Sequence, residues 1–129
     1  MFQTYRDKII EQAEAGFKTV VLSNPKGARV VYGKAKRVKP GERAGAGNIA
    51  IIDHAGPEYE AVIFEAVKQH GAVITATGGR VAHLAIVSRE VGALLVMWPL
   101  SIHLLDGDYL TIDSTEKTIT LGKKDSNLF

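Results

Sequence analysis

The chain has 129 residues, of which 46% are hydrophobic and 23% charged, and its formal net charge is +2. This composition predicts one globular domain with its own core, and so small and scattered a positive charge does not support nucleic-acid binding. Because the chain has no cysteine, disulfides and thiolate metal sites are excluded. Its apolar runs are too short to span a bilayer, and its start is unlike a signal peptide. We therefore expect a cytoplasmic protein with no membrane partner.

The first part of the chain combines a predicted helix with β-rich segments. Residues 3–15 carry apolar side chains at helical spacing, and Gly16 is typical of a residue that ends a helix. Residues 17–23 are rich in β-branched side chains and predict a strand. Residues 28–38 predict either a pair of strands or one bent strand, with Gly33 at the break.

The centre of the chain alternates apolar strands with helices. Its predicted elements are strands over 48–53, 72–75 and 93–98, and helices over 58–70 and 82–91. This order predicts a parallel sheet, because a strand that follows a helix normally returns parallel to the strand before that helix. Residues 104–113 and 117–122 then predict an antiparallel hairpin.

The most specific segment is TGGRVAHLAIVSREVG, residues 77–92, in which a glycine pair leads to a histidine at the start of a helix. Ligands of parallel α/β sheets bind beyond the carboxyl ends of the strands. Glycines let the backbone approach a ligand closely, and a helix N-terminus favours an anion. These arguments predict an anion site built from Thr75, Thr77, Gly78, Gly79, Arg80 and His83.

His83 is the candidate reactive group of this segment. The positive end of the helix disfavours an imidazolium, so we expect a neutral ring whose free nitrogen can accept a phosphoryl group. Arg80 can pair with phosphate oxygens, whereas Arg89 lies nearly two turns further along the helix. The alternative is structural: glycine pairs before helices are common, and a histidine in a first turn can simply cap or pack.

The residues of this segment have the spacing Thr75-x-x-Gly78-Gly79-x-x-x-His83-x-Ala85-Ile86-Val87-x-Arg89-Glu90-x-Gly92. This spacing resembles the signature of the phosphohistidine domain of phosphoenolpyruvate-utilising enzymes, a family that includes pyruvate phosphate dikinase, phosphoenolpyruvate synthase and enzyme I of the sugar phosphotransferase system. The resemblance covers about residues 27–122, through the segments GARVVYGKAKRV, NIAIIDHAGPEYEAV and LLDGDYLTIDSTEKTITLG.

The resemblance implies an α/β fold of the swivelling β/β/α type, with a parallel central sheet and a C-terminal β-hairpin. It divides the chain into a helix-and-strand extension (1–26), a phosphohistidine-like swivelling domain (27–122) and a tail (123–129). In the family the histidine is phosphorylated at one active site and carries the phosphoryl group to another, and His83 falls on that position. The expected phosphate-binding residues are those on the same loop and helix, namely Thr77, Gly78, Gly79, Arg80 and Arg89.

One departure from the family leaves two functions open. Val81 and Ala82 stand where the family usually has hydroxyl residues that can orient the imidazole or bind a phosphate oxygen. The chain is therefore either a stand-alone phosphoryl carrier of a phosphoenolpyruvate synthase or dikinase-like system, or a non-catalytic module for regulation or assembly in which His83 is not phosphorylated. A carrier requires a separate ATP-grasp or phosphoenolpyruvate-binding protein, because the chain has no phosphate-binding loop of its own. We expect no cofactor, and the sequence leaves the oligomeric state open.

Other candidate residues have simpler interpretations. His54 either lines the same cleft as His83 or is an ordinary loop histidine, and four scattered histidines give no metal spacing. Asp106 and Asp108 flank a glycine and are better explained as turn residues than as calcium ligands. Trp98 is expected in the core or at a subunit contact. We expect a solvated face of the predicted helix to carry Glu58, Glu60 and Glu65.

Overall fold

The computed structural model describes residues 16–122, so the predicted helix over 3–15 and the tail 123–129 lie outside the described residues. The strands are β1 (Phe17–Lys18), β2 (Val20–Ser23), β3 (Val30–Arg37), β4 (Asn48–Ile52), β5 (Ala72–Thr75), β6 (Leu94–Met97), β7 (Tyr109–Asp113) and β8 (Thr118–Leu121). The helices are α2 (Glu60–Lys68) and α3 (His83–Val91), and two short 3-10 helices are η1 (Pro57–Tyr59) and η2 (Pro99–His103). Neither α2 nor α3 has the length and apolar character needed to cross a bilayer.

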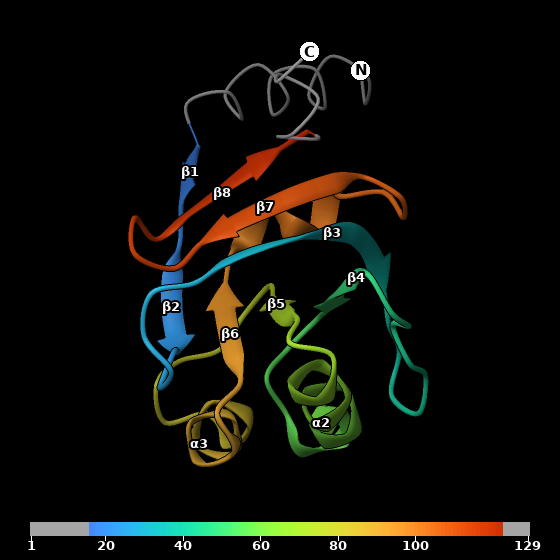
Figure 1. The fold of residues 1–129 in the computed structure, drawn as a ribbon. Coiled ribbons are helices and arrows are strands. Elements are labelled where there is room, and N and C mark those ends of the chain that lie inside the picture. The colour runs from blue at the N-terminus through green and yellow to red at the C-terminus, as the bar shows by residue number, and fades with distance from the viewer. Residues whose placement is uncertain (1–15, 123–129) are drawn as a thin grey trace.

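The strands form one hydrogen-bonded sheet in the order β1-β8-β7-β3-β4-β5-β6-β2. Strands β3, β4, β5 and β6 pair in parallel, whereas the other pairings are antiparallel. Helices α2 and α3 lie side by side on one face of the parallel strands (Figure 1). The predicted α/β class is confirmed.

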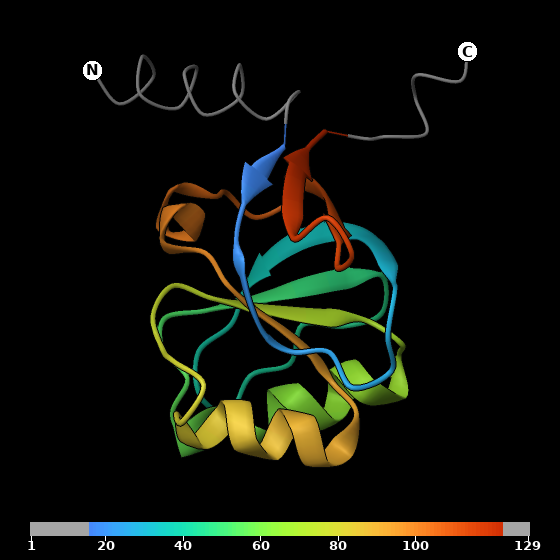
Figure 2. The ribbon, with the colours of Figure 1, turned by 90° about the vertical axis from the view of Figure 1, so that its left-hand side faces the viewer.

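The sheet folds back on itself through the segment 17–23. Strand β1 pairs with β8 at one end of the strand order, and β2 pairs with β6 at the other end. Only Thr19 separates β1 from β2, so one short segment joins both ends of the sheet. The result is two β layers with the helices as a third layer beneath them (Figure 2).

Side chains of the parallel strands point alternately into two cores, as the two-residue period of a strand requires. In β4, Ile49 and Ile51 belong to the core between the two β layers, together with Trp98, whose ring centroid lies 5.1 Å from that of Phe17. Ile52 of the same strand belongs to the second core, against the helices. Trp98 is thus a core residue, 2% exposed.

Strand β3 is one continuous strand that pairs with strands of both β layers. Its first half pairs with β7 and its second half with β4, and Lys34 pairs with both. At Gly33 an added Cβ atom would lie 2.9 Å from the carbonyl oxygen of Gly47 and 3.0 Å from Ile49 Cγ1. Glycine is therefore required at this position because the backbone of the neighbouring layer comes so close.

The predicted strand over 104–113 is too long, since β7 begins only at Tyr109. The residues before it form a loop in which carboxylates bind backbone amides. Asp106 Oδ1 accepts a hydrogen bond of 2.7 Å from the Arg37 amide, and Asp108 Oδ2 accepts one of 2.8 Å from the Leu105 amide. These two bonds agree with the interpretation of Asp106 and Asp108 as turn residues.

Replacing Gly33 by alanine tests the close approach of the layers. We expect Gly33→Ala to lower the free energy of unfolding by about 1–3 kcal/mol, because the new methyl group forces backbone atoms apart. Urea unfolding measures this change. Gly79→Ala is the control, since an added Cβ at Gly79 meets nothing within 4 Å; equal losses in the two variants would contradict the account of Gly33.

Candidate functional site

The loops that follow β4 and β5 are joined to each other at the carboxyl ends of these parallel strands. Thr77 Oγ1 donates a 3.3 Å hydrogen bond to the Asp53 carbonyl, and the Leu84 amide donates one of 3.1 Å to the Ala55 carbonyl. Gly78 has a φ of +135°, and an added Cβ there would lie 2.9 Å from Ala55 Cβ. The glycine therefore allows the second loop to pack directly against the first.

His83 is the first residue of α3, and it is exposed, as the sequence predicts. Its side chain has an exposed fraction of 47%. Its Nε2 atom is hydrogen-bonded to Oε2 of Glu60, the first residue of α2. The sequence pattern places Glu60 on a solvated helix face but misses this contact, in which its carboxylate binds the candidate reactive group.

The N-terminus of α3 has no side-chain cap. Ala82 occupies the N-cap position in an extended conformation and makes no side-chain hydrogen bond there. The Leu84 amide already has the Ala55 carbonyl as its acceptor. One of the first helical amides is thus used within the protein, and the anion site expected at this end of the helix is smaller than the sequence suggests.

The two arginines of the segment lie in different surroundings. Arg89 donates a 3.0 Å hydrogen bond to the Leu22 carbonyl and a 2.7 Å bond to the Arg80 carbonyl, so its guanidinium ties the loop and α3 to β2. Arg80 is exposed, and within residues 16–122 no carboxylate lies at ion-pair distance from its guanidinium. Of the two, Arg80 has the side chain that is open to a ligand.

A second histidine–glutamate pair lies in the loop after β4. His54 Nε2 is 3.0 Å from Glu58 Oε2, and both side chains are about half exposed. Hydrogen bonds from His54 and from its own backbone amide lower the pKa of the Glu58 carboxyl. Tyr59, buried between Glu58 and Glu60, packs against the edge of the His54 ring and anchors this segment.

The remaining sequence candidates have local partners. Thr75 Oγ1 donates a 2.7 Å hydrogen bond to the Thr77 carbonyl, inside the loop. Glu65 also has a local partner, since its carboxylate accepts a 2.9 Å hydrogen bond from the Ala44 amide. In the part of the chain that the structure describes, no three His, Asp or Glu side chains gather closely enough to hold a metal ion.

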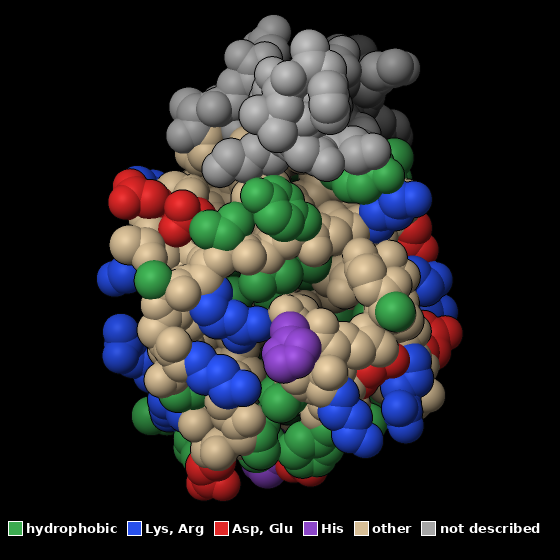
Figure 3. All heavy atoms as spheres, viewed as in Figure 1, with side chains coloured by type: hydrophobic (Ala, Val, Ile, Leu, Met, Phe, Trp, Pro, Cys, Tyr) green, Lys and Arg blue, Asp and Glu red, His purple; other side chains and the backbone are tan. Residues whose placement is uncertain are grey.

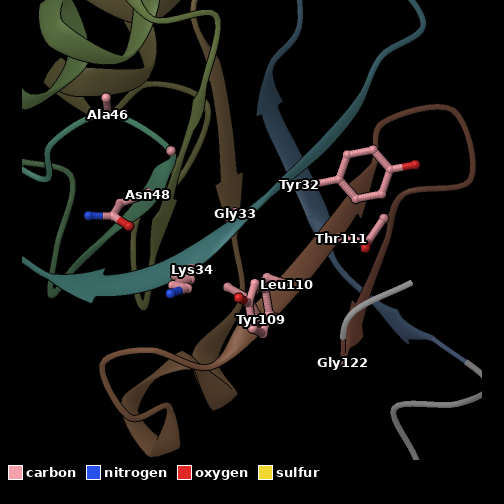
Figure 4. Close-up of a pocket in the computed structure, with 10 residues that line it drawn as sticks. Tyr32, Gly33, Lys34, Ala46, Asn48, Tyr109, Leu110, Thr111 and Gly122 are labelled. Atoms are coloured by element: carbon pink, nitrogen blue, oxygen red, sulfur yellow. The ribbon is translucent and has the colours of Figure 1, made fainter. Parts of the chain in front are cut away.

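A hollow of about 560 Å³ lies at the opposite end of the parallel strands (Figure 4). It is lined by residues such as Tyr32, Tyr109 and Asn48. Asn48 begins β4, whereas the loop of His83 follows the carboxyl end of the neighbouring parallel strand β5. The hollow is therefore separate from the histidine site. On the face that Figure 3 shows, basic and acidic side chains are interspersed around the molecule.

Comparisons with known proteins place the chain in a family and identify relatives. Residues 45–117 match the family described as "PEP-utilising enzyme, mobile domain". The chain is 32% identical over 117 residues to the probable phosphoenolpyruvate synthase of Pyrococcus abyssi, and 33% identical over 81 residues to the phosphoenolpyruvate synthase of Neisseria meningitidis serogroup B. These alignments cover 88% and 60% of this chain but only 13% and 10% of the relatives.

A solved structure supports the fold alone. The aconitase X of Thermococcus kodakaraensis matches with a TM-score of 0.53 at 14% sequence identity, over 82% of this chain and 97% of that chain. The family match covers more than half of the chain, including the strand ends, the glycine loop and His83. The chain therefore belongs to the family of mobile domains of phosphoenolpyruvate-utilising enzymes.

Proposed function

We propose that the chain is a phosphoryl carrier in which His83 accepts a phosphoryl group at one partner active site and delivers it at another. The observation that supports this most directly is the placement of His83, exposed at the start of α3, in a chain similar to segments of phosphoenolpyruvate synthases. A carrier needs its reactive group at the surface, because the group must enter the site of a second protein.

The loop around His83 is suited to holding a phosphoryl group that has already been transferred. The N-terminal end of α3 favours negative charge, and the exposed guanidinium of Arg80 can bind phosphate oxygens. Thr77, Gly78 and Gly79 shape the loop, and Arg89 holds it against β2. In this proposal the swivelling motion moves the loop and His83 together as one rigid unit.

The transfer step itself is the task of a partner. Phosphoryl transfer requires an aligned donor and several positive groups that neutralise the developing charge, commonly including a metal ion. The described residues around His83 supply one helix end and one open arginine. We therefore propose that an ATP-grasp or phosphoenolpyruvate-binding protein brings the donor, and that residues 1–129 alone neither hydrolyse ATP nor consume phosphoenolpyruvate.

The second candidate is a non-catalytic module for regulation or assembly, and the loop composition favours it. Val81 is 87% exposed, and Ala82 leaves α3 without a side-chain cap. Neither side chain can donate a hydrogen bond to a phosphate oxygen. In this alternative the loop keeps its shape while His83 stays unmodified.

The missing helix cap has a measurable consequence. We expect Ala82→Ser to raise the free energy of unfolding by about 0.5–2 kcal/mol, because a serine at the N-cap can accept a hydrogen bond from an amide of the first turn. Urea unfolding of the two proteins measures the gain. Ala61→Ser is the control, since Ala61 is exposed and is the second residue of α2, not its N-cap; a similar gain there would contradict the account of the cap.

The carrier function is tested by transfer of label. Residues 1–129 are mixed with labelled phosphoenolpyruvate or ATP, with and without a phosphoenolpyruvate synthase whose own mobile domain has been removed. We expect acid-labile label on the wild-type chain only when that partner is present, and none on His83→Ala. His70→Asn is the matched control, because His70 is also exposed and has a φ of 55°, which asparagine tolerates.

Three results would contradict parts of this proposal. Label on the wild-type chain without a partner would overturn its dependence on one. Equal label on His83→Ala would show that another residue is modified. No label with any partner of either class would leave the non-catalytic module as the function.

A further inference from the structure

The hollow beside the start of β4 is built on the outer face of the β layer that contains β7 and β8. Tyr32 of β3 pairs with Thr111 of β7, and in the same two strands Lys34 lies opposite Tyr109. Because side chains alternate along a strand, these residues point away from the core to which Val31 belongs. They line the hollow together with the loop before β4 (Figure 4). Its volume of about 560 Å³ is in the usual range of small-molecule sites.

Two tyrosine rings give the hollow aromatic walls. Tyr32 is 60% exposed and Tyr109 is 36% exposed, so each ring keeps a large accessible surface. Leu110, which also lines the hollow, is a core residue and adds apolar surface between the rings and the interior. Tyrosine rings stack on flat groups and lose little conformational freedom when they do so. The walls therefore favour a ligand with a planar aromatic ring.

The charge of the hollow comes from Lys34, the one charged side chain among the described residues that line it. Its Nζ atom lies 5.3 Å from the centroid of the Tyr109 ring. Within residues 16–122, no carboxylate lies at ion-pair distance from this lysine. The hollow thus has a positive charge beside an aromatic face and no lining carboxylate to balance it, which favours an anionic ligand.

Two neutral polar groups of the lining are not used by the described part of the chain. Asn48 Nδ2 donates a 2.6 Å hydrogen bond to the Ala44 carbonyl, which orients the amide and leaves its Oδ1 atom without a described partner. Thr111 is 3% exposed, and its hydroxyl oxygen has no hydrogen-bond partner among the described residues. A few polar groups within a mainly apolar lining are typical of sites that orient a small molecule.

We propose that this hollow binds a small planar aromatic molecule that carries one anionic group. The ring packs against Tyr32 and Tyr109, and the anionic group pairs with Lys34. The inference goes beyond the proposed carrier function, because the hollow lies at the opposite end of the parallel strands from the loop of His83 and its ligand does not touch that residue.

Naphthoate, an aromatic carboxylate, is the probe for this site. Proton–nitrogen NMR spectra of the full chain are recorded while naphthoate is added. We expect saturable shifts of the amide signals of residues 32–34, 47–48 and 109–111, and unchanged signals from the loop 77–83. The expected dissociation constant is on the order of 0.1–1 mM, as is usual for a ligand with so few non-hydrogen atoms.

Two related probes separate the contribution of the ring from that of the charge. Naphthamide keeps the aromatic ring without the negative charge, and cyclohexanecarboxylate keeps the charge without a flat ring. Each should bind about fivefold more weakly than naphthoate, which is the effect of losing one exposed ion pair or one aromatic contact.

Variants of the lining assign these contributions to residues. Lys34→Gln should weaken naphthoate binding about fivefold and leave naphthamide binding unchanged, because only the anion pairs with the lysine. Tyr32→Ala should weaken the binding of both naphthalene probes. Lys68→Gln is the matched control, since it removes the same charge from an exposed position on α2 and should change neither affinity.

Three results would overturn the assignment. The first is the absence of a saturable shift at these amides at about 10 mM naphthoate, well above the expected dissociation constant. The second is an equal loss of affinity in Lys34→Gln and Lys68→Gln. The third is a shift of the same amides when the protein alone is diluted, which would mean that a second copy of the chain occupies the hollow. Label transfer tests the carrier function separately, so either proposal can fail while the other stands.

Discussion

Burial of the parallel strands on both faces is the constraint on which the rest of the structure depends. Strands β4, β5 and β6 have only four or five residues each, and nearly all of their side chains lie in one of the two cores. Polar and reactive groups must therefore lie where the strands end. Because parallel strands end at the same edge, the loops after β4 and β5 meet there, and their backbone and side-chain hydrogen bonds bring His83 beside α2.

The site is consequently built from two helix starts that face each other. Helix α2 brings Glu60 and helix α3 brings His83, each as the first residue of its helix. The loop residues contribute shape more than chemistry: Gly78 permits the close packing, and Arg89 is engaged with backbone carbonyls. Arg80 is the one expected phosphate-binding side chain that the described residues leave open. In the proposed function, this surface keeps a small group attached to the exposed ring, and another protein activates the donor.

Much of this arrangement could be predicted from the sequence, because its signals are local. Apolar runs bounded by glycine or proline marked the strands now seen as β4, β5 and β6, and the glycine pair marked the turn before His83. The role of Glu60 could not be predicted, since its partner lies 23 residues away on another helix. The closure of the sheet through segment 17–23 depends on pairings with β8 and β6 that no local pattern reveals. The predicted strand over 104–113 includes the loop before β7, where aspartate side chains bind backbone amides.

The central claim is that His83 carries a phosphoryl group in the cell. The most direct measurement is the intact mass of the protein isolated from its own cells under alkaline conditions, which preserve phosphohistidine, followed by peptide mapping before and after brief acid treatment. The account predicts a fraction with the added mass of one phosphoryl group, located on the peptide that contains His83 and lost in acid. A protein that is unmodified under conditions shown to preserve phosphohistidine, or a phosphoryl group on another residue, would contradict the account.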